Sequence, residues 1–359
     1  MSRRPRASGY FRTDYGQDLA LIQTRLERVA LAVLAVTLVA LPALASPFLI
    51  DLATQTFLAV IGALALMLLT GYAGQVSLGH AGLLAAGAFT VGILAKELHA
   101  AFFVTLPAAA AVGALLGVLF GLPSLRVRGL YLAVSTLALH FVVVYLGGEY
   151  EAKRGFSTGI IIDPPRIAGK PLTDPRVWYV VLLLAAGASL ILCANLLRAR
   201  SGRAWAAIRA NETVAQALGI GVSAYKLLAF VTSSALTAFA GALFAYYRGF
   251  VSVEAFSLFL SIQYVAMIII GGMGSLLGAI LGAIFVTLLP YGIEAAIAAL
   301  PGANRYAGML FAVDYAAFGA LMMGFLLFEP RGLVGIWRRV QTYFLLWPFK
   351  HRPLSSAGK

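Results

Sequence analysis

Residues 55–82 read QTFLAVIGALALMLLTGYAGQVSLGHAG, and this stretch decides the class of fold. Its first part, 55–72, has no charged side chain and approaches the roughly 20 residues that a helix needs to cross a bilayer. Its second part is rich in glycine and carries three polar side chains, Gln75, Ser77 and His80. The stretch therefore predicts a membrane-spanning helix, followed by a segment where glycine permits either close helix packing or a break.

The rest of the chain is equally apolar. Of its 359 residues, 61% are hydrophobic and 11% are charged, against about 25% charged in soluble domains; the mean hydropathy is +0.90. This composition excludes a soluble or disordered protein and predicts an all-α polytopic membrane protein of about ten transmembrane helices. The apolar runs are 29–50, 55–72, 76–95, 100–124, 129–147, 177–197, 227–247, 255–271, 275–293 and 307–328. The run 76–95 either crosses fully or is a broken, re-entrant element.

Basic residues orient these helices. The formal net charge is +13, but Lys and Arg lie between the apolar runs, which indicates orientation in a membrane and not nucleic-acid binding. With the N-terminus in the cytoplasm, most of the 27 basic residues fall on the inner side, as the positive-inside rule requires. We expect a basic cytoplasmic segment 1–28, a transmembrane domain 29–328 and a basic cytoplasmic tail 329–359, where clustered cations can meet anionic lipid.

The chain has no catalytic or cofactor motif. It lacks a GxxxxGK[ST] phosphate loop and an HExxH pair, and its histidines are too scattered for a metal site. The single cysteine, Cys193, cannot form an internal disulfide. We therefore expect no cofactor, no metal and no enzymatic activity, and any ATP would be hydrolysed by a partner.

A second glycine group includes Gly271, Gly272 and Gly274. A broken membrane helix exposes backbone groups that need water, a ligand or polar partners, so that it usually lines a cavity. Gln75, Ser77, His80 and Gly272 are accordingly candidates for the wall of a translocation pathway. The alternative is that both glycine groups serve tight packing only, with His80 a satisfied packing residue.

The long polar loop 198–226 has helical character. Its apolar residues at helical spacing are Ala204, Ile208, Val214, Ala215 and Leu218. Asn211 is expected to cap a short helix over 212–218, which Gly219 ends. An amphipathic helix of this kind either lies on the lipid surface or docks in a groove of another protein.

Asp314 is the acid well inside a predicted span, 307–328. Intramembrane carboxylates mark ion-coupled carriers, pathways or subunit interfaces. Asp314 is therefore a candidate pathway residue, with a hydrogen-bonded structural acid as the alternative. It also defines a competing function, a secondary carrier that works alone with Asp314 as the coupling acid.

Six stretches together resemble the permease subunits of branched-chain amino acid ABC importers, the LivM type. They are GYAGQVSLGHAG at 71–82, RGLYLAVSTLAL at 128–139, GRAWAAIRANETVAQALGI at 202–220, YKLLAFVTSSALTAFAGAL at 225–243, IIIGGMGSLLGAILGA at 268–283 and FEPRGLVGIWRR at 328–339. The similarity covers roughly residues 55–340. The six stretches together are specific to this family, whereas each stretch alone is weak evidence for it.

The resemblance implies the ABC importer permease fold, in which a cytoplasmic coupling helix within 198–226 docks in a groove of the ATPase. The implied coupling residues are Arg209, Glu212, Ala215 and Gly219. Where the generic motif reads Glu-Ala-Ala, this chain has Thr213-Val214-Ala215, so that Glu212 lies one position early. This departure concerns the details of the contact and not the family.

The resemblance also implies partners, location and mechanism. The partners are a second permease subunit, expected to be a different chain, two ABC ATPase subunits and an extracytoplasmic substrate-binding protein. ATP-driven alternating access would carry branched-chain or related amino acids across a bacterial-type inner membrane. Permeases of the same type for urea or short amides are the alternative, because the binding protein supplies most of the selectivity.

Overall fold

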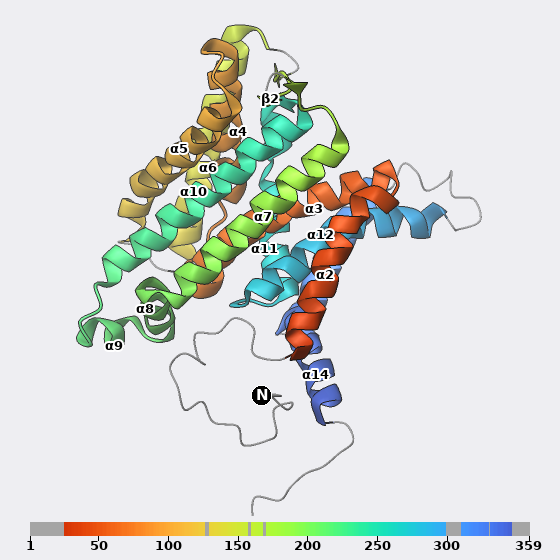
Figure 1. Ribbon diagram of the computed structural model, residues 1–359. Helices are drawn as coiled ribbons and strands as arrows, with labels where there is room; N and C mark the ends of the chain where they lie inside the picture. Colours follow the sequence, from red (N-terminus) through yellow and green to blue (C-terminus); the bar gives the residue numbers. More distant parts are fainter. Residues whose placement is uncertain are drawn as a thin grey trace, which may run out of the picture.

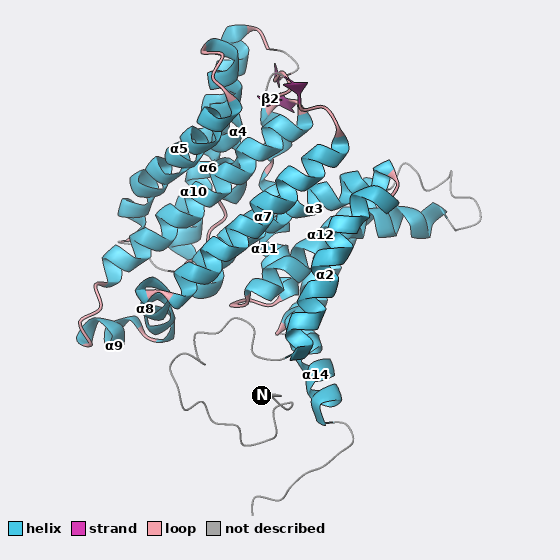
Figure 2. Ribbon diagram, viewed as in Figure 1, coloured by secondary structure: helices cyan, strands magenta, loops and turns pink. Residues whose placement is uncertain are grey.

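A computed structural model describes residues 25–125, 129–156, 159–167, 170–298, 310–329 and 331–346. Within these residues the chain is a bundle of helices with a few two-residue strands (Figure 1; Figure 2). The helices are α2 (Arg25–Leu44), α3 (Pro47–Leu66), η1 (Met67–Tyr72), α4 (His80–Glu97), α5 (Phe102–Ser124), α6 (Leu130–Arg154), α7 (Pro175–Arg198), α8 (Arg200–Ala210), α9 (Glu212–Ala217), α10 (Val222–Arg248), η2 (Val253–Phe256), α11 (Leu258–Gly271), α12 (Leu276–Ala298), α13 (Leu310–Phe328) and α14 (Gly332–Leu346).

The described residues contain six helices that are long and apolar enough to cross a membrane. They are Pro47–Tyr72, Phe102–Pro123, Tyr131–Arg154, Pro175–Arg198, Val222–Arg248 and Leu276–Ala295, and the shorter apolar segments are Ala32–Leu44, Leu258–Gly271 and Tyr315–Phe325. Together with α4, these segments occupy the places of the predicted runs. The protein is therefore an all-α polytopic membrane protein, and six of its described helices meet both the length and the hydropathy criterion for a span.

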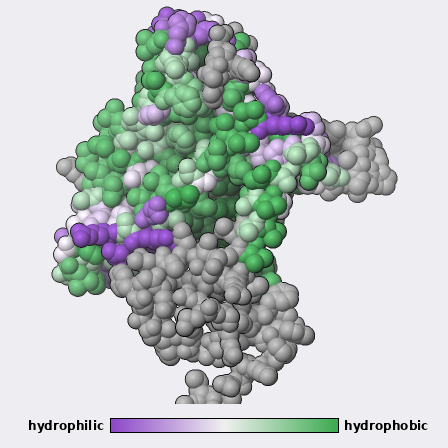
Figure 3. Space-filling model, viewed as in Figure 1, coloured by the Kyte–Doolittle hydropathy of each residue, from purple (hydrophilic) through white to green (hydrophobic). Residues whose placement is uncertain are grey.

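The surface of the molecule also separates apolar from hydrophilic side chains. On the face shown in Figure 3, apolar side chains cover the middle, and hydrophilic side chains gather toward the top, the upper right and the lower left. This is the distribution expected where the middle faces hydrocarbon and the ends face water.

Two helix boundaries lie inside the predicted runs, one of them at a capping signal. The first run, 29–50, is wrong at its end, because α2 stops at Leu44 and α3 begins at Pro47. Ser46 accepts a hydrogen bond from the Leu49 amide at 3.4 Å, and a proline at the first helical position favours a new start. The run 76–95 is helical only from His80 onward.

Helices α3 and α10 form the interior of the bundle. In the most apolar stretch of Pro47–Tyr72, which comprises α3 and η1, 83% of the residues are buried. In that of the peripheral helix α7, 22% are buried. Helix α10 packs along α4 and α5, and α3 packs against α7 and α12. The peripheral helices thus leave apolar faces for lipid or for another membrane protein.

Glycine brings α4 and α10 into direct backbone contact. A side-chain carbon added at Gly87 would lie 1.8 Å from the Ala238 carbonyl oxygen, and one at Gly241 would lie 1.9 Å from that of Leu84. Only glycine permits so close a crossing. Gly87 and Gly241 therefore serve the packing of these two helices.

The two ends of the bundle are built differently. At one end, strand β1 (Ile160–Ile161) pairs antiparallel with β4 (Phe250–Val251), which fastens the loop after α6 to the loop after α10. Strands β2 (Arg166–Ile167) and β3 (Lys170–Pro171) pair within the first of these loops. Helices α8 and α9 lie at the opposite end (Figure 1).

Candidate functional site

The helix that begins at Pro47 breaks before α4. Its last turn is the π-helix η1, after which the Ala73 amide donates to the Leu68 carbonyl at 3.0 Å. The chain then turns at Gly74, whose φ is +72°, and runs without helix to residue 79. We call residues 71–79 the first glycine turn. A π-helical end and an unwound segment leave backbone groups in need of partners, and they are frequent at functional sites.

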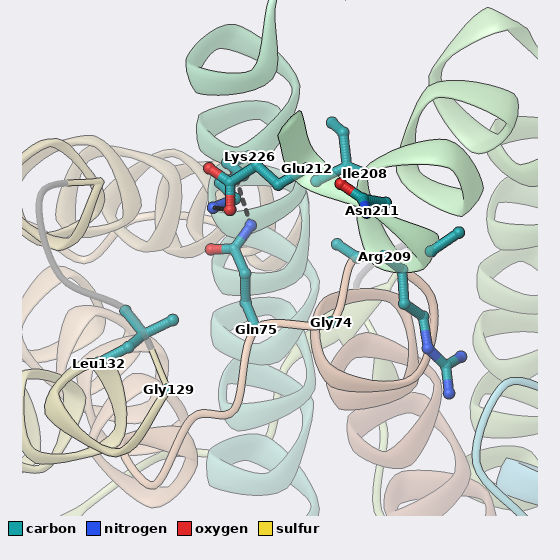
Figure 4. A pocket seen from close by; sticks show the side chains of 11 residues that line it. Gly74, Gln75, Gly129, Leu132, Ile208, Arg209, Asn211, Glu212 and Lys226 are labelled. Carbon is teal, nitrogen blue, oxygen red and sulfur yellow. Dashed lines mark hydrogen bonds and ion pairs between the residues drawn. The ribbon is translucent and has the colours of Figure 1, made fainter. Parts of the chain in front are cut away.

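Gln75 fastens the first glycine turn to α10. Its side chain is 5% exposed, and its Nε2 donates to the Lys226 carbonyl at 3.1 Å. The Thr70 hydroxyl donates to the Gln75 carbonyl at 3.0 Å. Gln75 also lines a cavity of about 540 Å³ at the α8–α9 end of the bundle (Figure 4). The structure therefore places this predicted pathway residue beside a polar space.

Ser77 and His80 are buried and do not line that cavity. The Ser77 hydroxyl accepts a long hydrogen bond of 3.4 Å from the Gly79 amide. The His80 ring lies 4.6 Å from the ring of Tyr264, and its Nδ1 is 3.4 Å from the Thr237 hydroxyl. The His80 contacts join α4 to α10 and α11, as packing requires, but its buried Nε2 has no hydrogen-bond partner among the described residues, so His80 is not the fully satisfied residue of the packing alternative.

The second glycine turn, residues 271–275, ends α11 and meets the first glycine turn. The Gly274 amide donates to Met67 Sδ at 3.2 Å, and a side-chain carbon at Gly71 would lie 3.0 Å from the Gly274 nitrogen. Two segments that are far apart in the sequence therefore touch where their helices stop.

Gly272 faces the start of α14 and not the cavity. Its φ is +114°, and a side-chain carbon there would lie 2.5 Å from the Arg331 carbonyl oxygen. Gly332 packs against the same point, since its own added carbon would lie 2.6 Å from the Gly272 nitrogen. The predicted pathway residue Gly272 is thus a contact between the second glycine turn and the C-terminal segment.

Local signals build α9 much as the sequence predicts. The Asn211 side chain accepts a hydrogen bond from the Val214 amide at 3.1 Å and caps the helix Glu212–Ala217. Gly219, with φ +82°, ends it, and the Ile220 amide donates to the Ala215 carbonyl at 3.1 Å. This bond is the longer one of a Schellman motif, which requires the left-handed residue that glycine provides.

The apolar residues of the loop 198–226 divide between two faces. Ala204, Ile208 and the predicted coupling residue Ala215, which is 2% exposed, lie against the bundle. Val214 and Leu218, by contrast, are 53% and 75% exposed. The sequence showed that all five lie at helical spacing. It did not show which of them face inward and which face outward, because this depends on the break between α8 and α9 at Asn211.

Arg209 and Glu212 direct their polar ends into the chain. The Arg209 Nη1 donates to the Gly71 carbonyl, and Glu212 Oε2 pairs with Lys226 Nζ at 2.8 Å. Both residues, with Gln75, line the 540 Å³ cavity (Figure 4). Of the four predicted coupling residues, two therefore contact the membrane helices, and Ala215 and Gly219 shape α9.

The two acids of interest differ in what the structure describes. Asp314 lies in α13, but its side chain is outside the described part of the chain. Asp51, in the second turn of α3, accepts hydrogen bonds from Tyr247 and from Gln55, the latter at 2.6 Å. The sequence missed Asp51 because the predicted runs left residues 51–54 between two spans. Its partners make it a structural acid.

The described residues contain no group of three or more His, Cys, Asp or Glu side chains able to hold a metal ion. The α8–α9 end contains other polar features. They are the side-chain donors Arg209 and Gln75, the ion pair between Glu212 and Lys226, and the two glycine turns that end η1 and α11. Beside them, the exposed side chains of Val214 and Leu218 form an apolar surface.

The comparisons with known proteins agree with these features. The family model described as branched-chain amino acid transport system / permease component matches residues 48–327. The chain is 33% identical over 345 residues to the high-affinity branched-chain amino acid transport system permease protein LivM of Escherichia coli, covering 89% of this chain and 77% of that protein. The probable branched-chain amino acid transport permease protein LivM of Methanocaldococcus jannaschii is 25% identical over 273 residues, covering 70% and 72%.

A shorter match extends to a different printed substrate. The autoinducer 2 import system permease protein LsrC of Klebsiella pneumoniae is 33% identical over 187 residues, covering 49% of this chain and 52% of that protein. No solved structure matches the chain. The family match spans most of the described bundle, including the broken helix and the α8–α9 loop. The chain belongs to the family of permease components of branched-chain amino acid transport systems.

Proposed function

We propose that this chain is the membrane-spanning subunit of an ATP-driven importer that carries branched-chain or closely related apolar amino acids. One observation carries the proposal beyond family membership. Helix α9 presents Val214 and Leu218 outward, while its neighbour α8 reaches the two glycine turns through Arg209. An exposed apolar contact and an internal connection in one loop are what a subunit driven by a separate ATPase needs.

The proposed partners follow from this division. An ATPase groove would receive α9 through Val214 and Leu218, and Ala215 and Gly219 would hold α9 in the shape that presents them. The full assembly would contain a second permease subunit, two ABC ATPases and an extracytoplasmic binding protein. The apolar faces of the peripheral helices would contact lipid and the second permease.

The proposed location is a bacterial-type cytoplasmic membrane, with both termini and the α8–α9 loop in the cytoplasm. Two features support this orientation. The loop 198–226 is rich in Arg, as inner loops are, and it lies at the end of the bundle opposite the β1–β4 strands (Figure 1). Lys96 and Glu97, near the β1–β4 end, belong to a more balanced charge distribution that includes the Arg154–Glu97 pair at 2.9 Å.

The choice of substrate rests on the extent of the similarity. The relatives named for branched-chain amino acids match most of this chain, whereas the autoinducer 2 permease matches about half. Branched-chain amino acids are therefore the first substrates to test, and autoinducer 2, urea and short amides follow. Of the candidate pathway residues, Gln75 is the one beside the cavity, and we assign it to the pathway wall; His80 instead contacts α10 and α11, and Gly272 contacts the start of α14.

The test begins with the tagged chain in detergent-solubilised native membranes. We expect a second permease and ATPases to co-purify, and the complex in liposomes to take up leucine only with ATP and binding protein. Leu218→Glu should lose the ATPases, since it places a charge in an apolar contact. The matched control is Leu98→Glu, an exposed leucine in the loop between α4 and α5, which should retain them.

One result would contradict the proposed importer. Recovery of the chain alone, with uptake that follows an ion gradient and needs no ATP, would replace the importer with a secondary carrier. Asp314→Asn would then be the next variant, because a coupling carboxylate cannot be replaced by an amide without loss of ion-driven uptake.

A further inference from the structure

The Arg209 side chain reaches from the last turn of α8 to both glycine turns. Its Nη1 donates to the Gly71 carbonyl. Its stem passes Gly74, where an added side-chain carbon would lie 3.3 Å from Arg209 Cγ, and one added at Gly274 would lie 2.9 Å from Nη1. The glycines at 74 and 274 therefore leave room for this arginine.

The bond to Gly71 serves a carbonyl that needs a donor. The last carbonyls of a helix have no intrahelical partner, and the negative end of the helix dipole attracts a cation. Within the described chain, no backbone hydrogen bond joins the two glycine turns, and the Gly274 amide donates to a weak acceptor, Met67 Sδ. The charge-assisted bond from Arg209 is thus a strong polar contact where the two turns meet.

A second connection from the α8–α9 loop runs to α10. Glu212 pairs with Lys226 at 2.8 Å, and the Lys226 carbonyl in turn accepts the bond from Gln75. Through Lys226, Glu212 is connected to the first glycine turn by way of α10, whereas Arg209 donates directly to the Gly71 carbonyl and lies against Gly74 and Gly274. The cavity of about 540 Å³ lies beside these two connections (Figure 4), and it leaves the loop room to shift.

We propose that Arg209 is a positioning residue of the transport cycle, which transmits movement of the α8–α9 loop to the two glycine turns and does not bind the ATPase. The inference rests on the proposed importer function and adds the route by which the loop reaches the membrane helices. A change between two packings requires a contact that differs between them. The bond between Arg209 and Gly71 is that contact.

The test uses the complete importer, co-purified from native membranes and reconstituted in liposomes with its binding protein. Arg209→Ala and Arg209→Met remove the donor, and the second keeps much of the stem. Arg209→Lys keeps the charge but not the planar fork. The matched control is Arg203→Ala, because Arg203 is an exposed arginine of α8 that donates to the Arg198 carbonyl at 3.0 Å.

The measured quantity is the number of leucine molecules transported per ATP hydrolysed. We expect this ratio to fall about tenfold in Arg209→Ala and Arg209→Met. A change of this size lies within the range that coupling between two sites typically produces. Arg209→Lys should be intermediate, and Arg203→Ala should match the unaltered complex. A residue that merely stabilised the fold would lower the yield of complex and leave the ratio unchanged.

A second readout follows the first glycine turn itself. Val76 is 44% exposed, and the single native cysteine of this chain, Cys193, is buried, so a Val76→Cys variant of this chain carries one accessible thiol, and labelling is followed on this chain after the subunits are separated. Its rate of reaction with a water-soluble maleimide should differ between nucleotide-free and ATP-trapped complexes. In combination with Arg209→Met, the difference should vanish while the nucleotide-free rate stays the same.

The outcomes separate this inference from the function on which it rests. Unchanged transport per ATP in both Arg209 truncations, or a maleimide difference that survives Arg209→Met, would overturn the role of Arg209 and leave the importer intact. Lack of ATP-driven uptake by the unaltered complex would overturn the importer itself, and this inference with it. If the truncations fail to assemble, Arg209→Lys decides by the same ratio.

Discussion

The two helices of the α8–α9 loop, separated by Asn211, differ in what holds them. Helix α8 is attached: Trp205 is fully buried, and its indole N–H donates to the Tyr225 carbonyl at 2.8 Å. Helix α9 has Ala215 as its buried residue and leaves Val214 and Leu218 exposed. The same apolar periodicity thus fastens one helix to the bundle and leaves the other with an exposed apolar face.

The largest effect is expected at the attached helix. Trp205→Ala removes a fully buried indole and its hydrogen bond, and it should destabilise the chain by about 3–5 kcal/mol. Thermal denaturation of the purified chain in detergent measures this loss. Trp205→Phe is the control, because it keeps most of the packing and gives up a hydrogen bond of about 1 kcal/mol. Equal stability of the alanine variant and the unaltered chain would mean that α8 is not attached through Trp205.

A smaller effect separates the two faces of α9. Ala215→Leu overfills a buried position and should cost about 1–3 kcal/mol of stability. Leu218→Ala, on the exposed face, should leave stability within about 0.5 kcal/mol and weaken ATPase binding about tenfold. Denaturation and an ATPase titration on the same two variants check this. If the two variants exchanged their effects, the orientation of α9 would be the reverse of that described.

The smallest effect concerns the cap between the helices. Asn211→Ala removes the acceptor of the Val214 amide and should destabilise α9 by about 1 kcal/mol. Faster hydrogen exchange of the amides in 212–217, with no change in α8, is the expected result. Asn211→Ser, which restores a capping oxygen, should return the slower exchange. Equal acceleration in α8 would contradict the independence of the two helices.

Most of the fold could be predicted from the chain because hydropathy and capping are local properties. The apolar runs lie where the helices are; a cap such as Ser46 or a glycine such as Gly74 shortens two of them, while helices such as α6 and α10 extend several residues beyond their apolar runs. The same local rules predicted α9 from Asn211 and Gly219. Asp51 was missed for a related reason, since a carboxylate interrupts an apolar run even when Tyr247 and Gln55 satisfy it.

The sequence by itself determined that this is a polytopic membrane protein of the branched-chain amino acid permease type, with a short capped helix in its polar loop. Only the tertiary structure decided that Ala215 faces inward, that Leu218 faces outward, and that Arg209 reaches Gly71. The reason is physical. Burial of one helix face depends on the elements beneath it, and a contact between turns as distant as 71–79 and 271–275 exists only once the other apolar helices have packed around α3 and α10.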